Sequence, residues 1–272
     1  MSESSHRLDV ELVRRGLARS RGQARELVEA GSVLLDGSSA TKASTSVKEG
    51  QNLELVSGVE GWVSRAAYKL AAAMEAFGPD GLSAASKRCF DIGACTGGFT
   101  QVLLREGARE VVALDVGHGQ LAEEIARDPR VIERSGINIR NANVGDLGGP
   151  AQFLVADLSF ISLRLVLPVL RDLVEATGDL VLLVKPQFEV GRERLGKGGI
   201  VRSAGNRAMA IEEVVAVARS VGLATKALRG SPIRGATGNA EYLLWLTPRP
   251  HEGMTAGQVT ALAATLSSEA LT

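Results

Sequence analysis

The hydrophobic pattern of the chain changes period repeatedly from residue 89 onward. Short, nearly continuous apolar runs, which are typical of buried strands, alternate with longer segments whose apolar residues recur at helical spacing. The predicted strands include 111–114, 151–156, 181–184 and 242–246, and the predicted helices include 99–106, 119–127, 163–175, 206–221 and 255–271. This alternation predicts an α/β domain with a mostly parallel sheet flanked by helices.

The N-terminal part of the chain has a different pattern. Apolar residues at helical spacing predict two helices before residue 30, and Ser20 stands at the N-cap position of the second. Short predicted strands follow at 33–35 and within 42–56, and Asp36-Gly37 is a hairpin turn pair. We therefore expect a small α+β domain at residues 1–57, a glycine-containing linker at 58–63 and the α/β domain at 64–272.

The stretch 89–100, CFDIGACTGGFT, reads as strand, tight turn and helix. Its glycines allow the backbone to approach a ligand at a helix N-terminus, but their spacing is not that of dinucleotide enzymes. An acid before the turn, Asp91, suits a cationic ligand such as S-adenosylmethionine (SAM) better than a pyrophosphate, although another nucleotide or a purely structural turn stays open at this point. The candidate cofactor-binding residues here are Asp91, Gly93, Ala94, Cys95, Thr96, Gly97, Gly98 and Phe99.

Charged residues stand at the ends of the other predicted strands. Asp115, with Val116 after it, follows an apolar run at the place where an acid would hydrogen-bond ribose hydroxyls. Asp157 and Lys185 follow the next two runs, and Glu241 precedes the last one. Taken singly, the last three are more often turn caps or surface ion pairs than functional residues. Because open α/β sheets place ligands at the carboxyl ends of their strands, we expect these side chains to converge there.

Charge and cysteine content exclude several classes of protein. The 31 basic and 31 acidic residues give a formal net charge of +0, so overall charge indicates no partner. Cys89 and Cys95, with 3 histidines, make neither a disulfide framework nor a metal motif; we expect no metal and interpret both cysteines as small buried side chains. No apolar run has the length of a spanning helix, and the polar start MSESSHR lacks the apolar core of a signal peptide, so we expect a cytoplasmic protein.

Arginines are concentrated in the predicted N-terminal domain. They avoid the apolar positions of the helices, which is compatible either with one basic surface for phosphates or with a solvated helix face. The N-terminal sequence resembles the S4-like RNA-binding domain. The residues that carry the resemblance are Arg7-Leu8-Asp9, Leu12, Gly16, Ser20-Arg21, Ala24, Gly31, Val33 and Asp36-Gly37. The resemblance implies RNA contacts from Arg7, Arg14, Arg15, Arg19, Arg21, Arg25, Lys42 and Arg65.

Along nearly its whole length the sequence resembles the TlyA family, relatives of the heat-shock (FtsJ-like) ribosomal RNA methyltransferases. The matching stretches are SRAAYKL (64–70), DIGACTGGFT (91–100), ALDVGHGQL (113–121), DLSFISLRLVLP (157–168), LVKPQFEVGRERLGKGGIVR (183–202) and SPIRGATGNAEYLLWL (231–246). The resemblance implies a Rossmann-like SAM domain that methylates the ribose 2′-hydroxyl of cytidines in ribosomal RNA. It also implies a catalytic tetrad of Lys69, Asp157, Lys185 and Glu241, with Lys185 as the base and Asp157 also beside the cofactor, although pattern alone makes Lys69 a surface charge.

The family has a shorter form that acts on large-subunit RNA and a longer form that acts on both subunits. Residues before Arg7 and the helix-like tail after Thr255 favour the longer form, so we expect 23S rRNA in 50S subunits and also 16S rRNA in 30S subunits as substrates. Glu60-Gly61-Trp62-Val63 departs from the family's Arg-Xaa-Trp-Val in the linker. Two alternatives are an RNA-binding ribosome assembly factor and a membrane-active haemolysin, a label the family often carries. The haemolysin is disfavoured because the sequence has no strongly basic amphipathic helix.

Overall fold

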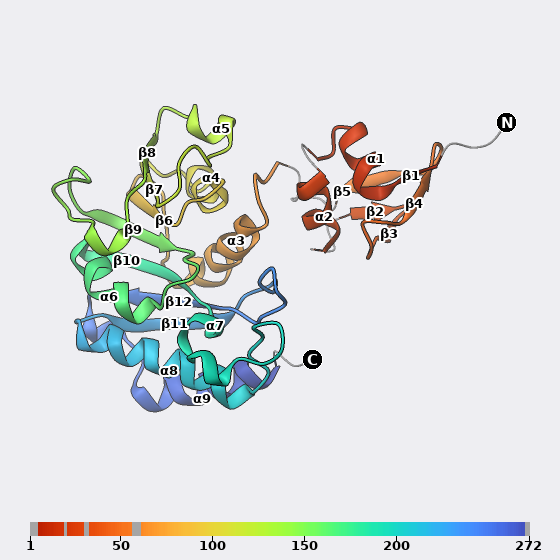
Figure 1. The fold of residues 1–272 in the computed structure, drawn as a ribbon. Coiled ribbons are helices and arrows are strands. Elements are labelled where there is room, and N and C mark those ends of the chain that lie inside the picture. The colour runs from red at the N-terminus through yellow and green to blue at the C-terminus, as the bar shows by residue number, and fades with distance from the viewer. Residues whose placement is uncertain (1–4, 19–20, 30–32, 56–60, 270–272) are drawn as a thin grey trace. The chain divides into compact units, whose positions relative to one another are not determined.

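The computed structural model describes residues 5–18, 21–29, 33–55 and 61–269. The chain divides into two compact units, Met1–Arg65 and Ala66–Thr272, which are coloured red to orange and orange to blue in Figure 1.

The first unit combines two helices with short antiparallel strands. Its elements are β1 (Ser5–Arg7), α1 (Leu8–Arg14), α2 (Arg21–Glu29), β2 (Val33–Leu35), β3 (Ser38–Ser39), β4 (Ser46–Lys48) and β5 (Leu53–Leu55). β1 pairs with β4, and β2 lies between β3 and β5. The β2–β3 hairpin turns at Asp36 and Gly37, whose φ angles of 49° and 77° fit the predicted turn pair. Ser20, the predicted N-cap, lies outside the described residues.

The second unit is an α/β domain. Its elements are α3 (Ala66–Phe77), β6 (Arg88–Ile92), α4 (Gly98–Arg105), β7 (Glu110–Asp115), α5 (Glu123–Ala126), β8 (Val131–Ser135), β9 (Ala151–Ala156), α6 (Leu163–Asp172), β10 (Val174–Val184), α7 (Pro186–Glu189), α8 (Ala204–Ser220), β11 (Ala224–Gly230), β12 (Tyr242–Thr247) and α9 (Ala256–Glu269). The sheet has seven strands in the order β11-β12-β10-β9-β6-β7-β8, and β12 runs antiparallel to both of its neighbours. The predicted fold class, a mostly parallel sheet with flanking helices, is confirmed.

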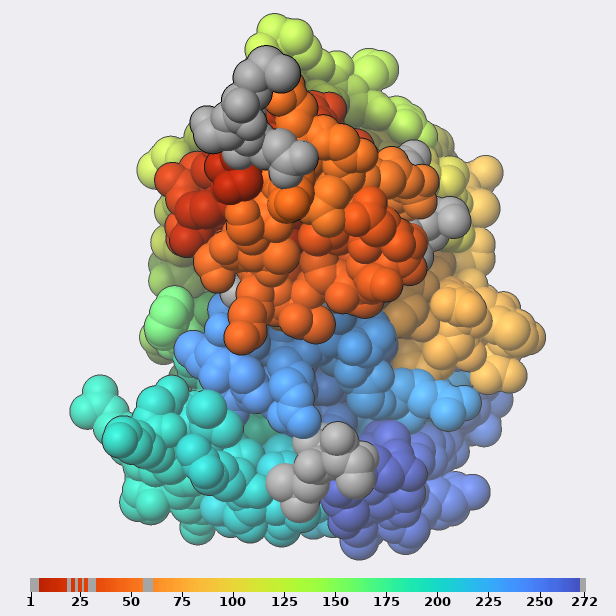
Figure 2. Space-filling view, turned by 90° about the vertical axis from the view of Figure 1, so that its right-hand side faces the viewer, coloured from red at the N-terminus to blue at the C-terminus, as the bar shows by residue number. Residues whose placement is uncertain are grey.

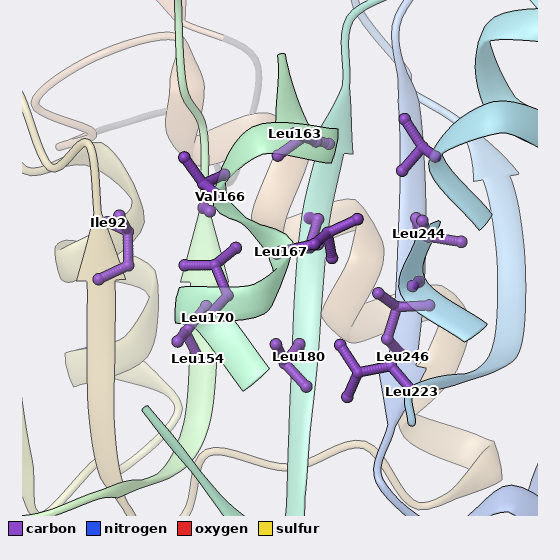
Figure 3. Close-up of a cluster of buried hydrophobic side chains, with 14 of the residues drawn as sticks. Ile92, Leu154, Leu163, Val166, Leu167, Leu170, Leu180, Leu223, Leu244 and Leu246 are labelled. Carbon is purple, nitrogen blue, oxygen red and sulfur yellow. The ribbon is translucent and has the colours of Figure 1, made fainter. Parts of the chain in front are cut away.

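Helices cover both faces of this sheet (Figure 1). On one face α6 buries the positions Leu163, Val166, Leu167 and Leu170, which follow helical spacing. Figure 3 shows these side chains packed toward Leu154 of β9 and Leu180 of β10, within one continuous apolar cluster. On the other face Phe77, at the end of α3, packs against Trp245 of β12 with ring centroids 5.6 Å apart. The two layers hold the carboxyl ends of the parallel strands in a fixed arrangement.

Some predicted boundaries are wrong. The helix predicted at 163–175 ends at Asp172, and β10 begins at Val174 instead of 181. The reason is that Val174 already pairs with Ala151 of β9, before a register shift that resumes regular pairing at Asp179. The helix predicted at 119–127 is confined to Glu123–Ala126, because the backbone is still non-helical at Ala122, whose ψ is 140°. β8 and β11 were not predicted. No described helix is long and apolar enough to cross a membrane.

Candidate active site

A cavity of about 500 Å³ opens where the strand order of the sheet reverses, between β6 and β9. Residues at the ends of three strands line it: Gly93 after β6, Asp115 and Val116 at and after the end of β7, and Asp157 after β9. Crevices at such a switch point are the usual ligand sites of open α/β sheets. The cavity is therefore the candidate ligand site of this domain.

The glycine-rich turn forms one wall of this cavity. Gly93 has a φ of 84°, and its amide donates to the carbonyl oxygen of Leu114 at 2.8 Å. A Cβ atom at this position would lie 2.9 Å from the Asp157 carbonyl oxygen, so only glycine lets the turn pass so close to β9. Gly97, with a φ of 90°, is packed just as closely against Ile125. The sequence pattern and the steric demands of the turn agree.

Asp115 holds the turn in shape. Its Oδ2 atom accepts a hydrogen bond from the Cys95 amide at 2.9 Å, and its Oδ1 atom accepts one from the Gly117 amide at 2.8 Å. Cys95 is exposed, with a φ of 47°, so the interpretation of both cysteines as buried holds for Cys89 and is wrong for Cys95. The turn needs the Cys95 amide at Asp115, and this leaves the thiol pointing out of the core.

Asp91 lies beneath the turn and is completely buried. Thr100 donates to its Oδ2 atom at 2.6 Å, whereas its Oδ1 atom has no hydrogen-bond partner among the described residues. Burial is the largest cause that raises the pKa of Asp91 to about 7. Asp91, Ala94, Thr96, Gly97, Gly98 and Phe99 are not among the residues that line the cavity, so they shape or underlie its wall.

Four charged side chains meet beside the cavity in an unbroken series of ion pairs. Lys185 Nζ lies 2.5 Å from Asp157 Oδ1, and Lys69 Nζ lies 3.3 Å from Asp157 Oδ2. The same Lys69 nitrogen lies 2.7 Å from Glu241 Oε2. The order is thus Lys185, Asp157, Lys69, Glu241, and the side chains come from α3 and from the ends of β9, β10 and β12.

The members of this series are nearly removed from water. Lys69, Lys185 and Glu241 are 6%, 8% and 4% exposed, so the expectation from pattern alone that Lys69 is a surface charge is wrong. Burying a charge is costly unless an opposite charge compensates it, and here each carboxylate faces an ammonium. The series is balanced in formal charge and fixed in geometry.

Two residues beside the series were missed by the sequence reasoning. Ser159 accepts a hydrogen bond from Lys185 Nζ at 2.9 Å. Phe160 is 92% exposed, has a φ of 64° and lies 5.4 Å from the Phe188 ring, centroid to centroid. Both line the cavity. Their signal in the sequence was their position directly after a strand-end acid, Asp157, in an otherwise apolar stretch.

In the first unit, the candidate RNA-binding arginines surround two buried carboxylates. Arg7, Arg21 and Arg25 contact Asp9, whereas Arg14 and Arg15 contact Glu11. Lys42 is exposed and Arg65 is half-buried, while Arg19 lies outside the described residues. Hydrogen bonding to Arg14, the largest cause, lowers the pKa of Glu11 to about 2. Both carboxylates therefore stay charged at neutral pH. The side chains of the five arginines around them are half-exposed or partly buried.

Comparisons with known proteins agree with this architecture. The family model of the FtsJ-like methyltransferases matches residues 62–247, and that of the S4 domain matches residues 6–53. The 16S/23S rRNA (cytidine-2′-O)-methyltransferase TlyA of Mycobacterium tuberculosis is 47% identical over 251 residues, which cover 92% of each chain. The 23S rRNA (cytidine-2′-O)-methyltransferase TlyA of Campylobacter jejuni is 33% identical, covering 83% of this chain and 93% of that one.

A solved structure gives the same result for the whole chain. The "Putative hemolysin from Streptococcus thermophilus" superposes with a TM-score of 0.71 at 37% identity and covers 98% of both chains. The chain belongs to the TlyA family of FtsJ-like methyltransferases that carry an N-terminal S4 domain.

Proposed function

We propose that the protein transfers a methyl group from SAM to the 2′-hydroxyl of cytidines in ribosomal RNA, in 23S rRNA and also in 16S rRNA. The observation that carries this proposal is the buried series from Lys185 to Glu241 beside a cavity at the switch point of the sheet. The names of the M. tuberculosis and C. jejuni relatives support the nucleotide and the rRNA. A ribosomal substrate would place the protein in the cytoplasm.

The cavity suits the chemical groups of SAM. The Asp115 carboxylate is already fixed by two backbone amides and would accept hydrogen bonds from the ribose hydroxyls of SAM. Val116 would lie beside the adenine base of SAM. Gly93 leaves room for backbone approach. Asp91 lies behind the cavity wall, and a cation bound in the cavity would favour the ionised form of its carboxyl group, whose Oδ1 atom has no hydrogen-bond partner among the described residues. We assign no separate contact to Ala94, Thr96, Gly97, Gly98 or Phe99 beyond shaping this wall.

Lys185 would receive the proton of the 2′-hydroxyl. SAM would supply a methyl group on a sulfonium. The bond between the 2′-oxygen and the methyl carbon would form as the sulfur–carbon bond breaks, and the hydroxyl proton would pass to Lys185 in its neutral amine form, after the Lys185 ammonium has released one proton to solvent. Asp157 and Ser159 fix that nitrogen from two sides, so that a third position is left for the substrate hydroxyl. Lys69 contacts the far side of the Asp157 carboxylate and is itself held by Glu241, so the orientation of that carboxylate is fixed.

The substrate would be held by both units. The half-exposed arginines of the S4 domain are suited to phosphates of folded RNA. In the methyltransferase domain the exposed Phe160 ring at the cavity offers a surface on which a base can stack.

The test is transfer of labelled methyl groups from SAM to 30S and 50S subunits that lack the modification, assayed separately. Digestion to nucleosides should then show the label in 2′-O-methylcytidine. Label in both subunits is the expected result. Label in 50S alone would limit the substrate to 23S rRNA. Absence of label from both, with RNA binding retained, would reject the enzyme in favour of an RNA-binding assembly factor.

A further inference from the structure

Three arginines of the S4 domain converge on one buried carboxylate, Asp9. Arg7 places Nε at 3.0 Å from Oδ1 and Nη2 at 3.3 Å from Oδ2, as a two-pronged contact. Arg21 places Nη2 at 3.0 Å and Nε at 3.3 Å from Oδ2, and Arg25 places Nε at 3.2 Å from the same oxygen. The Asp9 side chain is 0% exposed, whereas the three arginine side chains are 49%, 54% and 53% exposed.

This cluster has more positive charge than one carboxylate compensates. A single guanidinium is enough to compensate a buried carboxylate, and each further one adds repulsion between like charges. Among the side chains that the structure describes, three guanidiniums surround this one carboxylate, so the group of four is net positive and its outer half faces solvent. The Asp9 pKa is lowered, chiefly by the hydrogen bond from Arg7, so the acid stays ionised.

The geometry also decides which guanidinium atoms remain for a ligand. Arg7 and Arg21 use their Nε and Nη2 edge on Asp9, which directs Nη1 away from that carboxylate. Arg21 and Arg25 are four residues apart on α2 and so share one face of the helix, while Arg7 arrives from the end of β1. An anion outside the cluster would meet guanidinium donors from two elements at once.

We infer that Asp9 is a positioning residue for RNA: it gathers Arg7, Arg21 and Arg25 into a preformed site for phosphates of the folded substrate. The inference rests on the proposed rRNA substrate. This inference and an explanation based on charge alone predict opposite effects of removing Asp9 on RNA binding. Removing an acid from a basic surface should strengthen RNA binding if charge alone matters, but should weaken it if the acid holds the arginines in place.

The experiment uses the full-length variant Asp9→Asn, which keeps the size of the side chain and removes its charge. Initial rates of methyl transfer against subunit concentration should show a KM about tenfold higher, the loss of roughly one charge-assisted hydrogen bond, with kcat unchanged. Filter binding of the subunits without SAM should show the same loss of affinity. An unchanged or lower KM together with unchanged or tighter binding would overturn the inference.

Two controls separate positioning from loss of charge and from loss of the fold. Glu54→Gln removes an exposed acid of the same unit whose carboxylate accepts from Asn52, and it should leave KM unchanged or slightly lower. Val33→Ala opens a gap in the core of the unit, where Val33 is 0% exposed, without touching the arginines. Assayed below its melting temperature, it should keep the wild-type KM; a rise equal to that of Asp9→Asn would reduce Asp9 to a structural residue.

Failure of the proposed function would look different from failure of this inference. If the wild-type protein transfers no methyl group, the filter-binding comparison still decides whether Asp9 organises the arginines for RNA. If methyl transfer occurs and Asp9→Asn binds subunits as well as the wild type, only the inference on Asp9 is rejected.

Discussion

The Lys69 ammonium lies 2.7 Å from the Glu241 carboxylate, although Lys69 precedes the first strand of the catalytic sheet and Glu241 precedes its last. This pair closes the series of charges from the side opposite Lys185. The site therefore needs the complete domain, because α3 and β12 must both be packed before Asp157 is held from both sides.

Replacing Lys185 by alanine should remove most of the activity. A general base contributes about 10²- to 10⁴-fold, so kcat should fall in that range while SAM binding is retained. Single-turnover methyl transfer measures the chemical step, and calorimetry measures SAM affinity. Lys226→Ala is a matched control, since Lys226 also forms an ion pair, with Glu252 at 3.0 Å, outside the candidate site. Normal turnover by Lys185→Ala would remove the lysine from the mechanism.

Replacing Gly235 by alanine should displace the Glu241 carboxylate. A Cβ atom at residue 235 would collide with Glu241 Oε1, and the carboxylate is the group that can move away. Misplacement by about 1 Å costs on the order of 10²-fold in rate, so kcat should fall by about that factor with little change in unfolding temperature. Gly230→Ala serves as the control, because nothing lies within 4 Å of its added Cβ. Equal rates for the two variants would contradict a role for the Glu241 position.

Replacing Asp115 by alanine should weaken SAM binding. The change removes the acceptor proposed for the ribose hydroxyls and also frees the Cys95 and Gly117 amides. We expect the SAM dissociation constant to rise about tenfold or more, the loss of one or two charge-assisted hydrogen bonds, with the KM for subunits unchanged. Calorimetry checks the first and steady-state rates the second. Asp172→Ala, an exposed acid at the end of α6, should leave both constants as they are.

Asp91 should make stability depend on pH. Its folded-state pKa of about 7 lies above the ordinary aspartate value of 3.8, so the folded protein holds this proton to higher pH than the unfolded chain does. The stability contributed by the proton is therefore complete below about pH 4 and is lost as pH rises to about 7. Asp91→Asn should remove this decline. Urea unfolding at several pH values between 5 and 8 tests it, and parallel profiles for the two proteins would contradict the assignment.

Local pattern was enough for much of the fold. Strands β7, β9 and β12 lie where apolar runs predicted them, and α4 begins after the glycine-rich turn as expected. These elements are encoded within a few consecutive residues, because burial on a sheet demands continuous apolar runs and a close turn demands glycine. The early start of β10 was not predicted, because the strand begins where Val174 pairs with Ala151 of β9, and this pairing is not visible in the local sequence pattern.

The sequence by itself determined the fold class, the turn after β6 and the types of charged residue at the strand ends. Only the tertiary structure decided the order in which these charges pair, the burial of Lys69, the exposure of Cys95 and the gathering of three arginines on Asp9. The physical reason is the separation along the chain over which each effect acts. Hydrophobic periodicity acts between neighbours along the chain, whereas an ion pair depends on distance and burial, which exist only after separate elements have packed together.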